Sequence, residues 1–127
     1  MCDFVTDKTI PFYDKYKKEF KEAPNYTAGT YDGIYLLKDA IEKVGTLDPD
    51  KLVPQLEKAD YDSAAGRIVF DKTHDVTWGA KYVTALGTQW QDGKNVCVWP
   101  NDWEGVTYEG TVPYKLPDWV VEYYKKK

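Results

Sequence analysis

The stretch TYDGIYLLKDAIEKV, residues 30–44, decides the fold more than any other part of the chain. Its apolar residues recur at spacings of three and four, which predicts one amphipathic helix. Asp32 suits the positive pole at the start of such a helix, and Lys43 suits the negative pole at its end. Gly45 stands where a left-handed C-cap would end the helix. The predicted apolar stripe consists of Tyr31, Ile34, Leu37, Ile41 and Val44.

Two further helices flank this stretch. Residues 11–22 predict a helix that Thr9 caps and in which Pro11 occupies the first turn, where a missing N–H is tolerated. Its apolar side is formed by Phe12, Tyr16 and Phe20, which recur every four residues.

The third predicted helix opens with Asp48-Pro49-Asp50, a cap followed by an early proline. Pro54 removes a hydrogen-bond donor and disfavours helical backbone at the residue before it. We therefore expect either a late start near Asp50 or a kinked first turn.

From residue 61 onward the pattern changes from helical to extended. Residues 66–71 predict a short strand that ends in turn residues. Residues 81–90 and 95–99 predict a hairpin, because the intervening Asp92-Gly93 tolerates positive φ. The tail is irregular over residues 101–116, and a short final helix is predicted for residues 118–126. This α/β order contains no complete parallel crossover, so it is unusual for an independent domain.

The composition is that of a soluble globular protein, with 43% hydrophobic and 30% charged residues in 127. Aromatic residues make up 16%, which suits both packed cores and ligand clefts. The net charge is −4, and the basic residues form no stripe of the kind that displaces phosphate counterions. Lys125, Lys126 and Lys127 suit the negative pole of a final helix. We therefore expect no nucleic-acid partner.

The cysteines and the chain start leave the compartment open. Cys2 and Cys97 lie far apart and match neither a disulfide framework nor a metal site, so both a bridge and two thiols remain possible. No apolar run approaches membrane-spanning length. Met1-Cys2-Asp3 lacks the charged and apolar regions of a signal peptide, so we expect that an exported parent has lost its start in this chain.

The residues that carry catalysis in other proteins are sparse here. His74 is the only histidine and Ser63 the only serine; neither lies in a nucleophile motif. Asp75 could orient His74, but a hydrogen-bonded loop is the simpler interpretation. Metal ligation needs three or four converging ligands, which this chain does not offer, and no phosphate-binding loop is present. We expect no enzymatic activity, no metal and no cofactor; acidic pairs such as Asp60 with Asp62 are expected in turns and caps.

Recognition of a small molecule is the better-supported function. The loop of residues 24–29 delivers Tyr26 to a helix N-terminus. The ring can pack on the apolar part of a ligand, and first-turn N–H groups can receive a carboxylate or carbonyl oxygen. The alternative is that Tyr26 and Tyr31 only hold the helix against its neighbours.

In their order and spacing, these segments resemble the C-terminal part of type I periplasmic binding proteins of ABC importers, in the branched-chain amino acid and amide/urea group. The resemblance extends over about residues 9–100. Its segments are residues 9–13, residues 26–37 and 40–43, residues 66–71, His74-Asp75, residues 89–94 and residues 98–100.

The resemblance implies a fragment of a fold with two α/β lobes joined by three hinge strands. Residues 1–100 would be a segment of the N-terminal lobe plus the third hinge strand, and residues 101–127 a tail packing toward the other lobe. The parent would capture a small polar solute, such as an amino acid, an amide or a urea-like molecule, in the periplasm or another extracytoplasmic space. It would deliver this solute to a membrane permease. The implied ligand-binding residues are Tyr26, Thr27, Ala28, Thr30 and Tyr31.

The family also implies parallel strands against which the helical stripe would pack, and this chain lacks them. Each large aliphatic side chain left exposed forfeits about 1.5–3 kcal/mol, so four such residues forfeit roughly 6–12 kcal/mol, comparable to the stability of a whole domain. We therefore expect the chain to self-associate, by exchange of elements between copies. Two alternatives remain: a stand-alone protein-interaction module, and a sensor's ligand-binding piece of the same ancestry.

Overall fold

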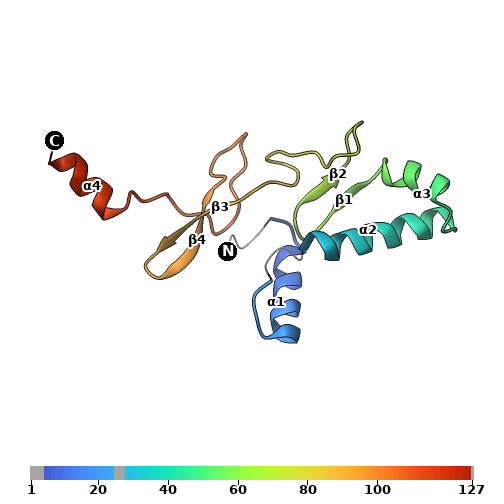
Figure 1. Ribbon diagram of the computed structural model, residues 1–127, viewed down its shortest axis with the longest axis horizontal. Helices are drawn as coiled ribbons and strands as arrows, with labels where there is room; N and C mark the ends of the chain where they lie inside the picture. The colour runs from blue at the N-terminus through green and yellow to red at the C-terminus, as the bar shows by residue number, and fades with distance from the viewer. Residues whose placement is uncertain (1–4, 25–27, 127) are drawn as a thin grey trace.

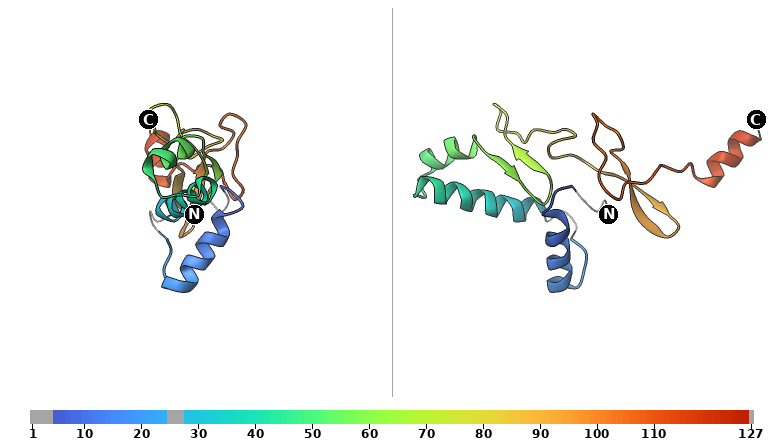
Figure 2. Two further views of the ribbon diagram at one scale, coloured as in Figure 1. Left: turned by 90° about the vertical axis from the view of Figure 1, so that its right-hand side faces the viewer. Right: turned by 180° about the vertical axis from the view of Figure 1, so that it is seen from behind.

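Helices and antiparallel hairpins make up the computed structural model, which describes residues 5–24 and 28–126. The elements are α1 (Thr9–Phe20), α2 (Ala28–Val44), α3 (Pro49–Leu56), β1 (Asp60–Asp62), β2 (Arg67–Val69), β3 (Gly87–Gln91), β4 (Lys94–Trp99) and α4 (Asp118–Lys125). The molecule is elongated: α1 to α3 and the β1–β2 hairpin form one end, the β3–β4 hairpin the middle, and α4 the other end (Figures 1 and 2). The predicted α/β class is confirmed.

Helix α1 covers Thr9–Phe20 instead of the predicted residues 11–22. It ends early because Lys21 adopts a left-handed φ of 62° and donates its N–H back to the last turn at 3.0 Å. The prediction that Thr9 caps the helix is wrong. Thr9 is the first helical residue, and its hydroxyl donates to the backbone oxygen of Ala64 at 2.9 Å.

Helix α2 ends at Val44, as predicted, and begins at Ala28 rather than at Thr30. Gly45 has a φ of 69° and donates its N–H to the Ile41 oxygen at 2.8 Å, which confirms the left-handed C-cap. The early start places residues 28 and 29 of the predicted loop in the helix.

The buried side of α2 is not the predicted stripe. Asp32, Leu36 and Ala40, spaced by four residues, are buried within the chain. Ile34 and Leu37 are 64% and 40% exposed. Tyr31, Ile41 and Val44 are half-buried, so the predicted stripe is only partly covered in this chain, whereas a polar residue occupies the buried side.

Helix α3 begins at Pro49, one residue before the late start that Pro54 predicted. Asp48 is its N-cap, and its carboxylate accepts from the Asp50 N–H at 3.1 Å. Pro54 lies inside the helix. The proline removes only its own N–H from the hydrogen-bond ladder, and the Leu52 N–H still donates to the Asp48 oxygen at 3.0 Å. No helix among the described residues is long and apolar enough to cross a membrane.

Strand β1 was not predicted, and the expectation that Asp60 and Asp62 lie in a turn is wrong. Asp60–Asp62 pairs antiparallel with Arg67–Val69. Of the strand predicted for residues 66–71, only Arg67–Val69 forms a strand. The Arg67 guanidinium donates two hydrogen bonds of 2.6 Å to the Asp60 carboxylate across the hairpin. This contact lowers the pKa of Asp60 and makes an acidic residue favourable in the strand.

The predicted second hairpin is confirmed at its turn and shortened at its first strand. Asp92 and Gly93 have φ values of 52° and 75°, as the Asp-Gly signal requires. Strand β3 covers Gly87–Gln91, however, and residues 81–86 form no regular strand. The chain turns at Gly79, which accepts from the Tyr82 N–H at 3.1 Å, so the residues before 87 leave the line of the hairpin.

The tail after β4 runs beside the β3–β4 hairpin before it reaches α4. The Gln89 side chain donates to the Lys115 oxygen at 2.6 Å and accepts from the Lys115 N–H at 3.0 Å. Residues 101–116 are irregular, as predicted, and the final helix ends at Lys125. Cys97 is buried and disulfide-bonded, which settles its state; Cys2 lies outside the described residues.

Candidate ligand-binding site at the start of helix α2

The structure places part of the predicted site on the first turn of α2. Ala28 is half-buried, Thr30 is exposed and Tyr31 is half-buried there. Tyr26 and Thr27 lie outside the described residues. Among these described residues, Tyr31 lines a cleft.

This cleft has a volume of about 420 Å³ and lies between the starts of α1 and α2 and strand β1. It has the size of a small-molecule site and combines aromatic with charged side chains. Sequence reasoning assigned most of these residues to helix faces and missed their convergence, because it joins elements separated by up to 54 positions. The lining residues are Asp7, Lys8, Pro11, Phe12, Lys15, Tyr31, Asp32, Tyr35 and Tyr61.

Ring contacts join α1 to α2 at the cleft. Tyr31 lies between Phe12 and Tyr35, and each neighbouring ring centroid is 4.8 Å from its own. A side-chain hydrogen bond shared with Tyr35, followed by burial, raises the pKa of Tyr31 above its ordinary value. Tyr31 therefore remains a neutral ring with a polar tip near neutral pH.

Two lysines supply positive charge to the cleft. The Lys8 ammonium lies 4.1 Å from the centroid of the Tyr61 ring and donates to the backbone oxygen of Asp62. Lys15 lines the same cleft from the second turn of α1. Aromatic walls beside ammonium groups can accommodate a molecule with an apolar body and an anionic group.

Asp32 fixes the start of α2 against the β1–β2 turn. It is only 1% exposed, and its two carboxylate oxygens accept from the N–H groups of Ala64 and Ala65 at 2.9 and 3.0 Å. The sequence assigned Asp32 only to the helix dipole. The missed signal is its position on the same side as Leu36 and Ala40, where a carboxylate must have hydrogen-bond partners.

The β1–β2 turn also contacts residues at and just before the start of α1. The Thr6 hydroxyl donates to the Ser63 oxygen at 2.5 Å, next to the contact that Thr9 makes with Ala64. Gly66 closes the turn with a φ of 141°, and a Cβ there would lie 2.8 Å from the Tyr82 oxygen. The starts of α1 and α2 are thus connected through one rigid turn, which orients the cleft.

The structure does not bring Ser63 and His74 together. Ser63 is fully buried, and its hydroxyl donates to the Gly66 oxygen at 2.6 Å. His74 contacts Glu57 rather than Asp75, and neither Ser63 nor His74 lines the cleft. Across the part of the chain that the structure describes, no group of three His, Cys, Asp or Glu residues is placed to hold a metal ion.

The sequence model of the periplasmic binding protein family matches residues 4–94, which include every residue that lines the cleft. The chain belongs to this family. The match includes α1 to β3 and ends at the turn of the second hairpin, so the tail and α4 lie beyond it.

Individual relatives agree with this assignment. The chain is 28% identical over 92 residues to the Leu/Ile/Val-binding protein homolog 7 of Brucella abortus (strain 2308), an alignment that covers 71% of this chain. The homolog 7 of Brucella melitensis is 27% identical over 92 residues. In both cases the chain spans 23% of the relative's length.

A solved structure supports the fold. The leucine-binding protein LivK of Thermotoga maritima superposes with a TM-score of 0.61 at 24% identity. The superposition covers 76% of this chain and 27% of that protein. The predicted fragment of a type I periplasmic-binding-protein fold is thereby confirmed.

Proposed function

We propose that the parent of this chain is the solute-binding protein of an ABC importer and captures a small amino acid, with an aliphatic amino acid as the best-supported ligand. The family match over residues 4–94, which includes the entire cleft, carries this proposal. The relatives whose names specify Leu, Ile and Val support the aliphatic class. Amides and urea-like solutes remain the next candidates in the test below.

The proposed contacts lie at the start of α2. Tyr31 presents an aromatic face to the cleft, and the first turn of the 17-residue helix offers N–H groups to a carboxylate. Lys8 and Lys15 add positive charge on the facing side. We assign Tyr31, Ala28 and Thr30 to this wall of the site, together with Tyr26 and Thr27, which precede the helix in the sequence.

The parent is proposed to act outside the cytoplasm, to deliver its solute to a membrane permease and to catalyse no reaction. The disulfide at Cys97 supports an oxidising compartment, because such bonds are rare in reducing ones. Residues 1–100 are assigned to the N-terminal lobe and the third hinge strand, and residues 101–127 to a tail that packs toward the other lobe. The exposed aromatic side chains of the tail support this second contact.

The chain by itself is proposed to form one wall of the site and to self-associate through its uncovered apolar surface. Ile34 and Leu37 are exposed on α2, and Leu47 follows them in the next loop. Analytical sedimentation at micromolar concentration tests this. A sedimentation coefficient that rises with concentration is expected, and a monomer throughout would contradict it.

Calorimetric titration of the full-length parent tests the function. Leucine, isoleucine and valine should bind more tightly than acetamide or urea, and Tyr31→Ala should weaken the best ligand by about tenfold or more, because a ring contact and its burial are lost. Thr46→Ala, in the loop after α2 and away from the cleft, is the matched control. If no amino acid, amide or urea binds, the proposed function is wrong. If the affinity is unchanged in Tyr31→Ala, only the assignment of Tyr31 to the site is wrong.

A further inference from the structure

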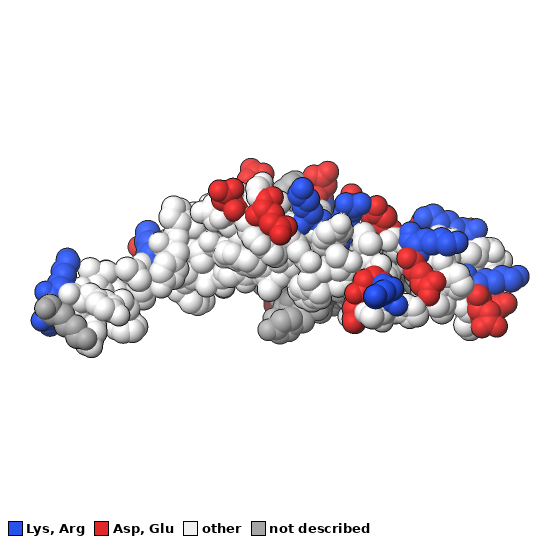
Figure 3. Space-filling model, turned by 90° about the horizontal axis from the view of Figure 1, so that it is seen from above, with Lys and Arg blue, Asp and Glu red and all other residues white. Residues whose placement is uncertain are grey.

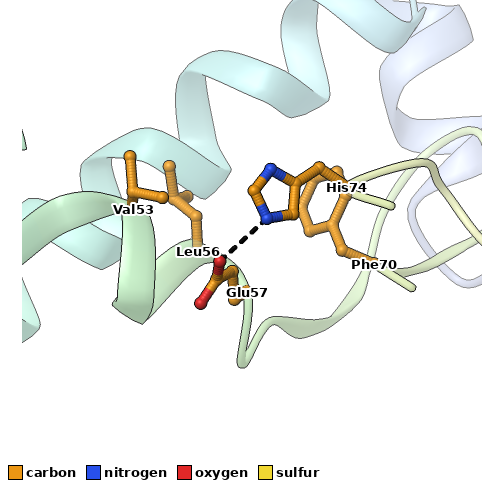
Figure 4. A pocket seen from close by; sticks show the side chains of 5 residues that line it. All are labelled: Val53, Leu56, Glu57, Phe70 and His74. Atoms are coloured by element: carbon orange, nitrogen blue, oxygen red, sulfur yellow. Dashed lines mark ion pairs between the residues drawn. The ribbon is translucent and has the colours of Figure 1, made fainter. Parts of the chain in front are cut away.

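A second cavity lies between α3 and the loop that follows β2 (Figure 4). Its volume is about 210 Å³, and it shares no lining residue with the cleft at the start of α2. Val53 and Leu56 form its wall on α3, and Phe70 faces them from the end of β2. Glu57 and His74 form its polar edge.

The loop that presents His74 is held by its own hydrogen bonds. The Asp71 carboxylate accepts from the Thr73 N–H at 2.7 Å and from the Asp75 N–H at 3.2 Å. The Thr73 hydroxyl donates to the same carboxylate, and these contacts lower the pKa of Asp71. His74 adopts a left-handed φ of 67° in this tight loop. The imidazole is therefore directed toward α3 by an ordered turn.

The electrostatics at this edge favour a cation. Glu57 Oε1 lies 2.9 Å from His74 Nε2, which leaves the second carboxylate oxygen for another donor (Figure 4). Glu57 directly follows the last residue of α3, where the negative pole of the helix adds to the carboxylate charge. An apolar chamber with a carboxylate at its edge complements a molecule with an apolar body and one positive group.

We propose that this cavity binds a small primary ammonium compound whose apolar part is a branched alkyl or single aromatic group. The ammonium contacts the Glu57 carboxylate, and the apolar part fills the space between Leu56 and Phe70. A volume of about 210 Å³ equals roughly seven water molecules, so ligands with about six to eight non-hydrogen atoms fit. This site goes beyond the proposed solute-binding function and does not depend on it, since the two sets of lining residues are separate.

The single histidine of the chain gives a local readout. The ring-proton NMR signals of His74 are followed at constant pH while the 127-residue chain is titrated with 3-methylbutylamine hydrochloride. The neutral 3-methylbutanol and the anionic 3-methylbutanoate carry the same apolar body and serve as matched probes. We expect the amine to half-saturate the shift at about fivefold lower concentration than the alcohol, as a partly exposed charge contact allows.

Two variants separate the contributions of charge and space. Glu57→Gln should remove the preference for the amine over the alcohol, whereas Glu42→Gln, an equally simple loss of charge on α2, should keep it. Val53→Trp, at a partly exposed wall position, should fill the chamber and weaken both probes even with Glu57 intact. Circular dichroism confirms the helices in each variant. Equal shifts by amine and alcohol, stronger binding of the anion, or no shift with any probe would each overturn the proposal.

Discussion

Helices α2 and α4 both carry aromatic and aliphatic side chains along one side, yet only α2 is anchored. Asp32, Leu36 and Ala40 are buried on α2, and Asp32 connects it to the β1–β2 turn. Helix α4 has no buried residue, and Trp119 is 73% exposed. An amphipathic pattern thus predicts that a helix forms, whereas a buried polar contact determines where it is held. The family match follows the same division, since it includes α2 and stops before α4.

The surface shows the same contrast. In the view from above, acidic and basic side chains alternate over the end formed by α2 and α3. A group of acidic side chains lies near the middle, and charged side chains are sparser from there to the basic tip of α4 (Figure 3). Ion pairs on the helical end include Lys38 with Glu42 and Lys43 with Asp39, each at i,i+4 spacing. The helical end therefore has the surface of a solvated domain.

The largest effect is expected from Asp32→Ala. The substitution leaves the buried Ala64 N–H without its acceptor and removes one of the two acceptors of the half-buried Ala65 N–H, which also donates to Ser63 Oγ at 3.2 Å. It should lower the free energy of unfolding by about 2–4 kcal/mol. Urea unfolding followed by circular dichroism measures this. Asp39→Ala on the same helix removes only a surface ion pair and should cost about 0.3–0.5 kcal/mol. Equal losses in the two variants would show that the Asp32 contact does not anchor α2.

A smaller effect is expected at the turn itself. Gly66→Ala should lower the free energy of unfolding by about 1–3 kcal/mol, because the residue has a φ of 141° and its new Cβ would meet the Tyr82 backbone. Gly33→Ala should change the free energy of unfolding in the opposite direction. Gly33 lies inside α2 with open space around it, so the substitution should stabilise the chain by about 0.5–1 kcal/mol. Thermal unfolding of both variants decides the matter. A Gly66→Ala variant as stable as the parent sequence would mean that the turn adapts freely.

The contrast between the ends also explains how far the sequence could predict the structure. Local signals were sufficient for α2, its Gly45 cap and the Asp92-Gly93 turn, because each depends on neighbouring residues. They failed for β1, whose two aspartates resemble a turn until Arg67 supplies a partner across the hairpin. They also failed for residues 81–86, which have strand-forming side chains but form no continuous ladder: Val83 makes an isolated bridge to Trp78.

The candidate site was predictable only in part for the same reason. The sequence pattern placed Tyr31 in the apolar stripe of a helix, and only the family resemblance implied a ligand-binding role; the structure places Tyr31 at the cleft. Lys8 and Tyr61 join it only after the chain folds back, and no spacing rule connects positions so far apart. The role of Asp32 required knowledge of which side of α2 is buried, and this depends on partners that the helix sequence does not specify.

Tyr108 offers a test of how the tail is attached. Its hydroxyl donates to the Ala80 oxygen at 3.2 Å, and burial raises its pKa above the ordinary value near 10. The pKa of Tyr108 is higher in the folded chain than in the unfolded chain. The contribution of the buried, neutral phenol to stability is therefore fully present below pH 10 and is lost as the pH rises through the folded pKa. We expect the ultraviolet titration of Tyr108→Phe to lack one late tyrosinate step. Its tail amides should exchange hydrogen faster, while those of α2 should be unchanged; faster exchange in α2 would show that the two ends are coupled.

The smallest effect is expected from Trp119→Ala. Because this side chain is 73% exposed and α4 buries nothing, the free energy of unfolding should change by no more than about 0.5 kcal/mol when measured at low chain concentration. At high concentration the same substitution should lower the apparent stability only if α4 contacts another copy, since association stabilises by mass action. Unfolding curves at two concentrations, compared with Asp14→Ala on the exposed side of α1, separate these cases. A loss of 2 kcal/mol or more at low concentration would mean that α4 packs on its own chain and that the division between an anchored and an unanchored end is wrong.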